Sequence, residues 1–189
     1  MSNPASSDSS FESLLSTNLR NASVSVLFDA ENFDSSGCSL TEQSVRRCCE
    51  AALAAQSLVT LNSVAEIELS VQFVGPEDMQ ALNRQYRGKD SPTNVLSFES
   101  GLPAFQVSDS ADAGNLLALG DLVFCPEVVV HEASAQGKVC DHHWQHLFVH
   151  GTLHLCGYDH EDSGDAETME SLEIQIPVSY THLTLPTKA

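Results

Sequence analysis

Basic residues are scarce in this sequence of 189 amino acids. It has 8 Lys plus Arg against 26 Asp plus Glu, which gives a formal net charge of −18 at pH 7. Such a charge favours a soluble protein and excludes the binding of polyanions through overall charge. Any contact with a nucleic acid would therefore need a local basic patch.

Long apolar runs are also missing. No run approaches the roughly 18 residues needed to span a bilayer, and the N-terminus lacks both the basic flank and the apolar centre of a signal peptide. From these two absences we expect a cytoplasmic protein with no membrane segment.

The sequence has cysteines but lacks CxxC pairs. Without a signal peptide, its cysteines are expected to be reduced and to act as small buried side chains. The six are Cys38, Cys48, Cys49, Cys125, Cys140 and Cys156. Cys156 lies close to the histidines discussed below, but on a helix it would face away from His154, two residues earlier.

The length and the 42% apolar composition predict one domain with a single core. No repeat is visible, and helical and strand patterns are interleaved. We expect residues 21–176 to form an α+β (mixed α/β) domain with a sheet of about four strands and several helices. Residues 1–20 are predicted to be a disordered tail. Residues 177–189 are predicted to be an unstructured or non-native tail, and His182 there is given no role.

Periodicity and turn residues locate the expected elements. Strands are predicted at 24–28, 67–73, 95–98 and 116–125, and helices at 41–59, 76–86, from 126 onward, 139–156 and 165–176. Thr41 is a plausible N-cap. Residues 99–115 are expected to form a long loop, either an insertion or a functional segment.

The strongest chemical signal is the stretch H-G-T-L-H-L-C-G-Y-D-H at residues 150–160. Helical residues four apart share a face, so His150 and His154 can direct two imidazoles to one point. Gly157 can end the helix in a left-handed turn, after which His160 can return toward the pair. Three imidazoles leave a fourth tetrahedral position for water, as in a catalytic zinc site; Ni or Co can also occupy such a site.

Two other functions fit this spacing. His-x3-His-x2-Gly-x2-His is the spacing of metzincin proteases, but those enzymes carry a glutamate directly after the first histidine as general base, and here that position is Gly151. A zinc peptidase therefore remains the alternative enzyme. A non-catalytic protein is the other possibility, and it would hold a structural metal in a closed site of four ligands; the resemblance given below would make that protein a ribosome-assembly factor.

Other side chains on the same predicted helix have simpler interpretations. His143 and His146 are interpreted as ordinary core or surface histidines, or as partners that orient a ligand imidazole. Trp144, Leu147 and Phe148 are expected to face the core.

A second constellation lies between residues 83 and 98. Arg84, Arg87 and Lys89 give this segment three of the chain's eight basic residues. An arginine presents a planar fork that matches phosphate oxygens. The same residues could instead complement the dipole at a helix C-terminus, and the pattern alone leaves both interpretations open.

These motifs resemble a known family. H-G-T-L-H-L-C-G-Y-D-H resembles the signature of the YbeY family of bacterial metal-dependent endoribonucleases, also called rRNA maturation factors. Four other segments are similar to that family in the same order: M-Q-A-L-N-R-Q-Y-R-G-K-D-S-P-T-N-V-L-S-F, G-D-L-V-F-C, H-W-Q-H-L-F-V-H and D-A-E-T-M-E-S-L-E. The resemblance covers roughly residues 64–176. The family usually continues to a segment ending near Asp-Pro-Tyr, which residues 177–189 replace.

The resemblance implies a cytoplasmic endoribonuclease that cuts single-stranded RNA. It implies action on the 3′ region of small-subunit rRNA, a role in ribosome quality control, and contact with small ribosomal subunit proteins. His150, His154 and His160 fall on the family's three ligands to one zinc ion (Zn2+), and Arg87 falls on an arginine needed for activity and phosphate binding. The implied fold is a mixed sheet with surrounding helices and with the metal helix in a cleft.

The mechanism expected from these residues is metal-assisted phosphodiester hydrolysis. The zinc would polarise a phosphate oxygen or lower the pKa of a bound water, and Arg87 would offset charge that develops on the phosphate. The sequence does not separate water from the RNA 2′-OH as the nucleophile.

Overall fold

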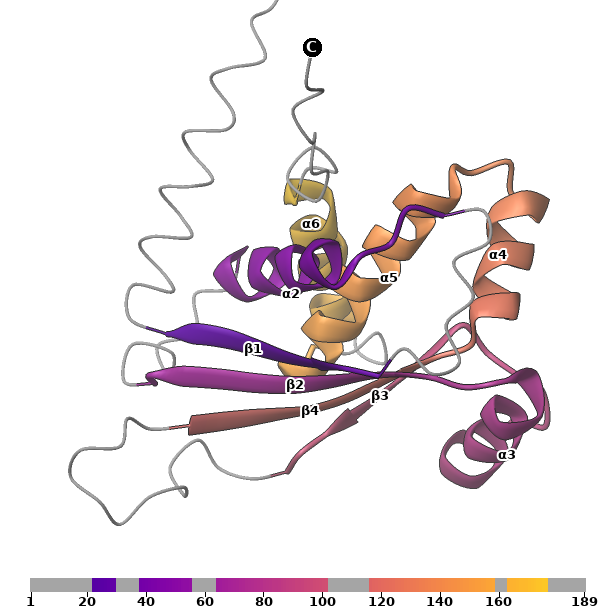
Figure 1. Ribbon diagram of the computed structural model, residues 1–189, viewed down its shortest axis with the longest axis horizontal. Helices are drawn as coiled ribbons and strands as arrows, with labels where there is room; N and C mark the ends of the chain where they lie inside the picture. The colour runs from indigo at the N-terminus through magenta and orange to yellow at the C-terminus, as the bar shows by residue number, and fades with distance from the viewer. Residues whose placement is uncertain (1–21, 30–37, 56–63, 102–115, 159–162, 177–189) are drawn as a thin grey trace, which may run out of the picture.

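The computed structural model of the chain describes residues 22–29, 38–55, 64–101, 116–158 and 163–176 (Figure 1). Both predicted tails, 1–20 and 177–189, lie outside the described residues. Most of the predicted loop at 99–115 lies outside them as well.

A four-stranded mixed sheet forms the base of the described fold. Its strands are β1 (Ser23–Phe28), β2 (Glu66–Phe73), β3 (Val95–Glu99) and β4 (Leu116–Phe124), in the order β1-β2-β4-β3. β1, β2 and β4 are parallel, and β3 pairs antiparallel to β4 at the edge of the sheet. The predicted mixed sheet is confirmed.

Five helices are present among the described residues. They are α2 (Glu42–Ala55), α3 (Pro76–Arg87), α4 (Pro126–Ala135), α5 (Cys140–Leu155) and α6 (Ser163–Gln175). In Figure 1, α2, α5 and α6 lie over one face of the sheet and α3 lies on the opposite side. The predicted α+β class is confirmed. No helix in this described part combines the length and apolarity needed to cross a bilayer.

Local sequence explains where the helices begin. The Thr41 Oγ1 accepts a hydrogen bond from the Ser44 N–H at 3.1 Å, which confirms the predicted N-cap of α2. α3 and α4 each begin with a proline in their first turn, where the missing N–H costs no helical hydrogen bond.

The main core lies between the sheet and α5. Phe124 of β4 packs against Phe148 with ring centroids 4.6 Å apart, and Trp144 stacks on Phe148 at 5.7 Å. Trp144, Leu147 and Phe148 are buried, as predicted. Aromatic pairs of this kind contribute about 0.5–1.5 kcal/mol each beyond their buried area, so they fix the rotation of α5 on the sheet.

Gly151 sets how closely α5 approaches the sheet. A Cβ at this position would lie 2.9 Å from the Leu122 Cδ2 and 3.4 Å from the Ser97 Oγ. The Ser97 hydroxyl also donates a hydrogen bond to the Gly151 carbonyl at 3.2 Å. Together these contacts hold α5 against β3 and β4, close to the open edge of the sheet.

All six cysteines are free thiols. Cys48, Cys49 and Cys125 are buried, as predicted for small core side chains, whereas Cys38, Cys140 and Cys156 are only half-buried.

Candidate metal centre

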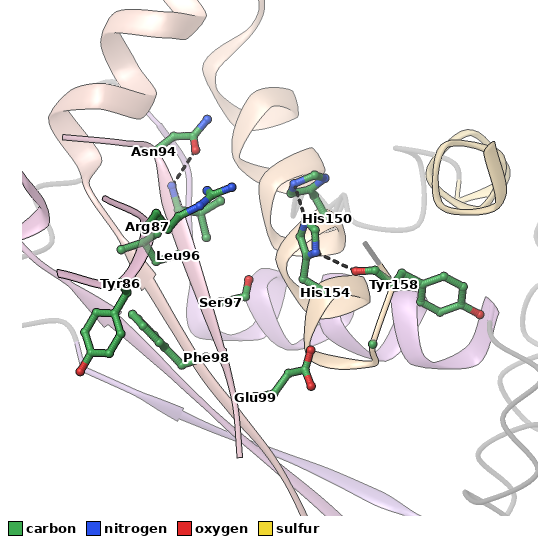
Figure 2. A pocket seen from close by; sticks show the side chains of 12 residues that line it. Tyr86, Arg87, Asn94, Leu96, Ser97, Phe98, Glu99, His150, His154 and Tyr158 are labelled. Carbon is green, nitrogen blue, oxygen red and sulfur yellow. Dashed lines mark hydrogen bonds between the residues drawn. The ribbon is translucent and has the colours of Figure 1, made fainter. Parts of the chain in front are cut away.

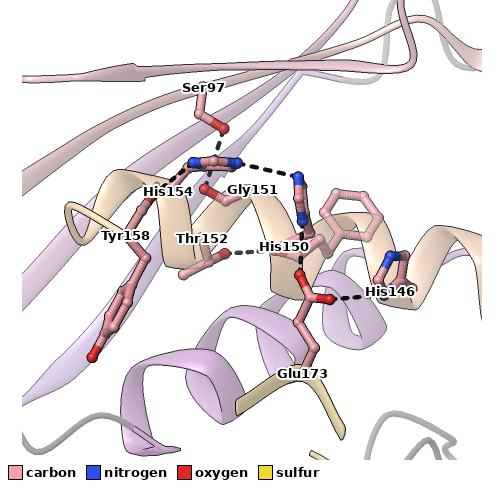
Figure 3. A network of polar contacts seen from close by, with 9 residues as sticks. Ser97, His146, His150, Gly151, Thr152, His154, Tyr158 and Glu173 are labelled. Atoms are coloured by element: carbon pink, nitrogen blue, oxygen red, sulfur yellow. Dashed lines mark hydrogen bonds and ion pairs between the residues drawn. The ribbon is translucent and has the colours of Figure 1, made fainter. Parts of the chain in front are cut away.

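Two predicted ligands meet on one face of α5. His150 and His154 are one helical turn apart, and their Nε2 atoms lie 3.2 Å from each other (Figure 3). The two rings are nearly perpendicular, with centroids 4.6 Å apart. The structure therefore brings this predicted pair together.

Hydrogen bonds at the Nδ1 atoms fix the orientation of the two imidazoles. The His154 Nδ1 lies 2.7 Å from the Tyr158 carbonyl oxygen, and the His150 Nδ1 lies 2.7 Å from the Glu173 Oε1. A carbonyl oxygen only accepts, and so does an ionised carboxylate, so each Nδ1 carries the proton. When both imidazoles are neutral, their Nε2 atoms therefore direct lone pairs toward each other.

This donor set fits a metal ion. Two facing lone pairs cannot hydrogen-bond to one another, whereas a tetrahedral zinc ion about 2.0–2.1 Å from each nitrogen would separate the two nitrogens by about 3.3–3.4 Å. The observed 3.2 Å is close to that separation. Ligand imidazoles in zinc sites characteristically donate their second N–H to a carboxylate or a backbone carbonyl, and both kinds of acceptor are present here.

The turn after α5 places one of these acceptors. Gly157 has a φ of 88°, its N–H donates to the His154 carbonyl at 2.9 Å, and the Tyr158 N–H donates to the Leu153 carbonyl at 3.2 Å. This is a Schellman turn, and it confirms that the helix ends at the glycine as predicted. The turn brings the Tyr158 carbonyl back onto His154. The third predicted ligand, His160, lies outside the described residues.

A second group of donors lies on the far side of His150. Ligand atoms of His146, His150 and Glu173 all lie within 4.8 Å of one another, and these three residues could hold a metal ion. The His146 Nδ1 is 3.9 Å from the Glu173 Oε2. Burial lowers the pKa of His146, although the Glu173 carboxylate raises it in part, and a lower pKa favours the neutral form that binds metals.

Glu173 was not singled out from the sequence. It belongs to α6 and is 23 residues from His150, so no local spacing connects the two residues. Its side chain is only 13% exposed, which is low for a glutamate and indicates a specific role in the contact between α5 and α6.

His143 has a structural contact instead. Its Nε2 lies 3.1 Å from the Glu132 Oε2, and that oxygen also accepts a hydrogen bond from the Asn94 Nδ2 at 2.9 Å. The buried imidazole thus joins α5 to α4 and to the start of β3. This agrees with the interpretation of His143 as an ordinary histidine.

An open cleft of about 770 Å³ lies in front of the histidine pair. It is lined by residues of α3, β3 and α5, including Arg87, Ser97, His150 and His154 (Figure 2). Arg87 is exposed at the last turn of α3, and Figure 2 shows its side chain extending toward the histidine side of the cleft. The predicted phosphate-binding residue and two predicted ligands therefore share one cleft.

Local contacts order the turn between α3 and β3, which follows Arg87. Gly88 ends α3 with a φ of 68°, and the Asn83 Nδ2 donates to the Ser91 carbonyl at 2.7 Å. Arg84 forms an ion pair with Asp90 at 3.7 Å. Among the described residues, by contrast, no carboxylate is recorded within 4.0 Å of the Arg87 guanidinium, so its charge is available for an anionic ligand.

Comparisons with known proteins point to one family. The sequence profile of the family described as Endoribonuclease YbeY matches residues 30–181. Curated relatives with that name include proteins from Chromohalobacter salexigens (53% identical over 113 residues, 58% of this chain and 66% of the relative) and Francisella tularensis (42% over 121 residues, 64% and 70%). A relative from Halorhodospira halophila is 51% identical over 109 residues, which are 58% of this chain and 68% of that protein. The matches thus span about two thirds of each relative.

Among solved structures, the solution structure of TM1509 from Thermotoga maritima aligns with 88% of this chain and 100% of its own. The sequence identity is 20% and the TM-score is 0.46.

Proposed function

This chain belongs to the YbeY family of endoribonucleases, an enzyme family acting on RNA, and we propose that it is a zinc-dependent hydrolase that cuts single-stranded RNA. One observation carries the proposal. The facing Nε2 atoms of His150 and His154 share a cleft with the guanidinium of Arg87. A cation site beside an arginine that can bind phosphate is suited to the cleavage of a phosphodiester.

His150, His154 and the predicted third ligand His160 would hold the zinc ion. A bound zinc ion supplies Lewis acidity toward a phosphate oxygen and lowers the pKa of a water that it binds. Glu173 and the Tyr158 carbonyl hold the two described imidazoles in the tautomer that presents Nε2.

Arg87 would bind the scissile phosphate. Its planar fork can hold two phosphate oxygens at once, and its charge offsets the negative charge that grows on them during cleavage. The ordered turn at Gly88 supports this role, because it limits the freedom that Arg87 must lose on binding.

The family resemblance also supports a proposal for the biological substrate. We propose that the chain acts on the 3′ region of small-subunit rRNA in the cytoplasm, during rRNA maturation and ribosome quality control, in contact with small ribosomal subunit proteins. The acidic chain is suited to a basic protein partner.

A peptidase role has less support from the same helix. Gly151 occupies the position of the metzincin glutamate, and a Cβ there would point at Leu122 of β4. A carboxylate at this position would meet the sheet. Incubation with casein and with single-stranded RNA separates the two enzyme classes, and the proposal expects cleavage of the RNA alone. Zinc content without any cleavage would instead favour the non-catalytic assembly factor.

Histidine variants decide which donor set binds the ion. We expect His154→Ala to lose both zinc, measured by elemental analysis, and chelator-sensitive RNA cleavage. His146→Ala is the matched control one helical turn before His150, and it is expected to keep both. If His146→Ala loses the zinc while His154→Ala retains it, the ion belongs to the His146, His150 and Glu173 set and the proposed site is wrong.

Arg87 is tested separately from the metal. Arg87→Ala is expected to fold normally and keep its zinc but to lose about 10²- to 10³-fold in kcat, the usual cost of removing one donor to a developing oxyanion. Arg84→Ala is the control, because Arg84 lies on the same helix turn but is paired with Asp90. Undiminished cleavage by Arg87→Ala would remove its catalytic role.

A further inference from the structure

An exposed aromatic ring stands at the mouth of the same cleft. Tyr86 is 59% exposed although it is large and partly apolar. Of the five large hydrophobic residues exposed among the described residues, Tyr86 is the aromatic one, and it is the one that lines the cleft. Its exposure is therefore unlike that of an isolated surface leucine or valine.

The ring is held in place. Tyr86 packs edge-to-face against Phe98 of β3, with ring centroids 4.9 Å apart and an interplanar angle of 71°. Phe98 itself packs against a small buried cluster formed by Met79, Leu96, Val123 and Cys125. In Figure 2 the two rings lie together below Arg87, whereas the ring of Tyr158 points away from them. Tyr86 is thus an anchored ring with open surface.

The position of Tyr86 next to Arg87 suggests a function for its ring. Tyr86 and Arg87 are consecutive residues on the last turn of α3, and both line the cleft that contains His150 and His154. Proteins that bind single-stranded RNA combine a cation for the backbone with aromatic rings on which bases stack. A nucleotide whose phosphate is held by Arg87 would carry its base next to Tyr86.

The overall charge of the chain favours a contact that does not depend on electrostatics. A net charge of −18 repels RNA, so bulk electrostatics cannot supply the affinity that most RNA-binding surfaces obtain from many basic residues. Stacking does not depend on net charge, and it requires an unpaired base, which a duplex does not offer.

We propose that Tyr86, supported by Phe98, is a stacking platform for one unpaired base next to the scissile phosphate and selects single-stranded RNA. This inference rests on the proposed RNA cleavage and adds to it the residue that determines the preference for single strands.

The test compares substitutions of Tyr86 that keep an aromatic ring with substitutions that remove the ring. Tyr86→Phe is expected to cleave a short single-stranded RNA like the wild type. Tyr86→Ala and Tyr86→Leu are expected to raise KM about 5- to 150-fold with kcat largely kept, which corresponds to 1–3 kcal/mol per stacked base. Val139→Ala is the control, because Val139 is 60% exposed but does not line the cleft.

An abasic substrate series identifies the stacked base. Wild-type kcat/KM should fall at one abasic position beside the cut, and Tyr86→Ala should show no further loss at that position. Tyr86→Leu behaving as the wild type, or equal losses in wild type and Tyr86→Ala at every abasic position, would overturn the proposal.

A binding measurement keeps the two proposals distinguishable. If the wild-type protein cleaves no RNA, the proposed activity fails, and the stacking role is then decided by fluorescence of an RNA that carries 2-aminopurine. Quenching by wild type and Tyr86→Phe but not by Tyr86→Leu supports the platform. Equal quenching by all three, or no quenching, rejects it.

Discussion

At the scale of single residues, His154 shows how a backbone turn determines chemistry. The atom that faces its Nδ1 is a carbonyl oxygen, which can only accept a hydrogen bond, so the proton stays on Nδ1. Any cation that reaches Nε2 therefore meets a lone pair. The orientation is fixed by the Schellman turn at Gly157, which supplies that carbonyl, and needs no additional side chain.

Cys49 illustrates the opposite case, a titratable residue whose burial makes it inert. It is fully buried in α2, and burial raises the pKa of its thiol from 9.0 to about 12, against a smaller lowering by the neighbouring Thr152 side chain. At neutral pH the thiol is protonated and unreactive, in agreement with the predicted role of a small core side chain.

The raised pKa predicts a loss of stability in alkali. Above pH 9.0 the unfolded chain releases the Cys49 proton and the folded protein retains it until about pH 12, so the neutral thiol's contribution is complete below 9.0 and is lost as the pH rises through that window. The free energy of unfolding, from urea titrations, should therefore fall more steeply for the wild type than for Cys49→Ala, by up to about 1.4 kcal/mol per pH unit. Parallel pH profiles would contradict this prediction.

At the scale of elements, the contact between α5 and α6 organises the histidine side of the cleft. α6 supplies Glu173, which lies 2.7 Å from the His150 Nδ1 and 3.9 Å from the His146 Nδ1 (Figure 3). One carboxylate thus faces two histidines of the same helix. The position of α6 therefore controls how His150 is presented.

Removing that charge should weaken metal binding without abolishing it. Glu173→Gln keeps an acceptor oxygen but loses the carboxylate, and outer hydrogen-bond partners of this kind are typically worth 10- to 100-fold in metal affinity. We expect a loss of that size in competition with a chromophoric chelator, with an unchanged melting temperature. Glu170→Gln, an exposed glutamate of the same helix, is the control.

Two results for the zinc affinity of Glu173→Gln would change the role assigned to Glu173. Unchanged zinc affinity in Glu173→Gln would mean that Glu173 does not orient His150. Complete loss of zinc, equal to that of His150→Ala, would make Glu173 a direct ligand in the alternative set.

Most elements could be predicted from local patterns. The alternation at Ile67, Leu69, Val71 and Phe73 marks β2, because each of these residues is buried on one face of a single strand. The pair His150 and His154 could be predicted because helix geometry joins residues four apart. Glu173 could not, because its contact depends on how two helices pack. The strand order likewise depends on tertiary packing, and so does the common cleft of Arg87 and the histidines. The family resemblance did predict that these residues act in one site.

At the scale of the whole molecule, acidity limits how RNA can be held. The cleft offers Arg87 as the cation beside the predicted metal centre, in a chain of net charge −18. Affinity must therefore come from a few local contacts, because the net charge of the chain opposes binding.

This balance predicts a shallow dependence of RNA binding on salt. With one to three phosphates neutralised, the logarithm of the binding constant of a short single-stranded RNA should fall with the logarithm of salt concentration at a slope of about −0.7 to −2. Arg87→Ala should make the slope shallower by about 0.7, whereas Tyr86→Ala should weaken binding at an unchanged slope. A slope several times steeper would reveal an extended basic surface and contradict the local picture.

The origin of Glu173 in α6 also has a consequence for the order of synthesis. A ribosome adds His150 and His154 first and reaches Glu173 only after 19 further residues, roughly 1–4 s later at 5–20 residues per second. The Tyr158 carbonyl is added shortly after His154. His150 lacks its hydrogen-bond acceptor until α6 has been translated, has left the ribosome and has packed against α5. The two imidazoles thus acquire their orientation one after the other, and in a nascent chain the proposed metal site stays half-assembled until the last described helix is in place.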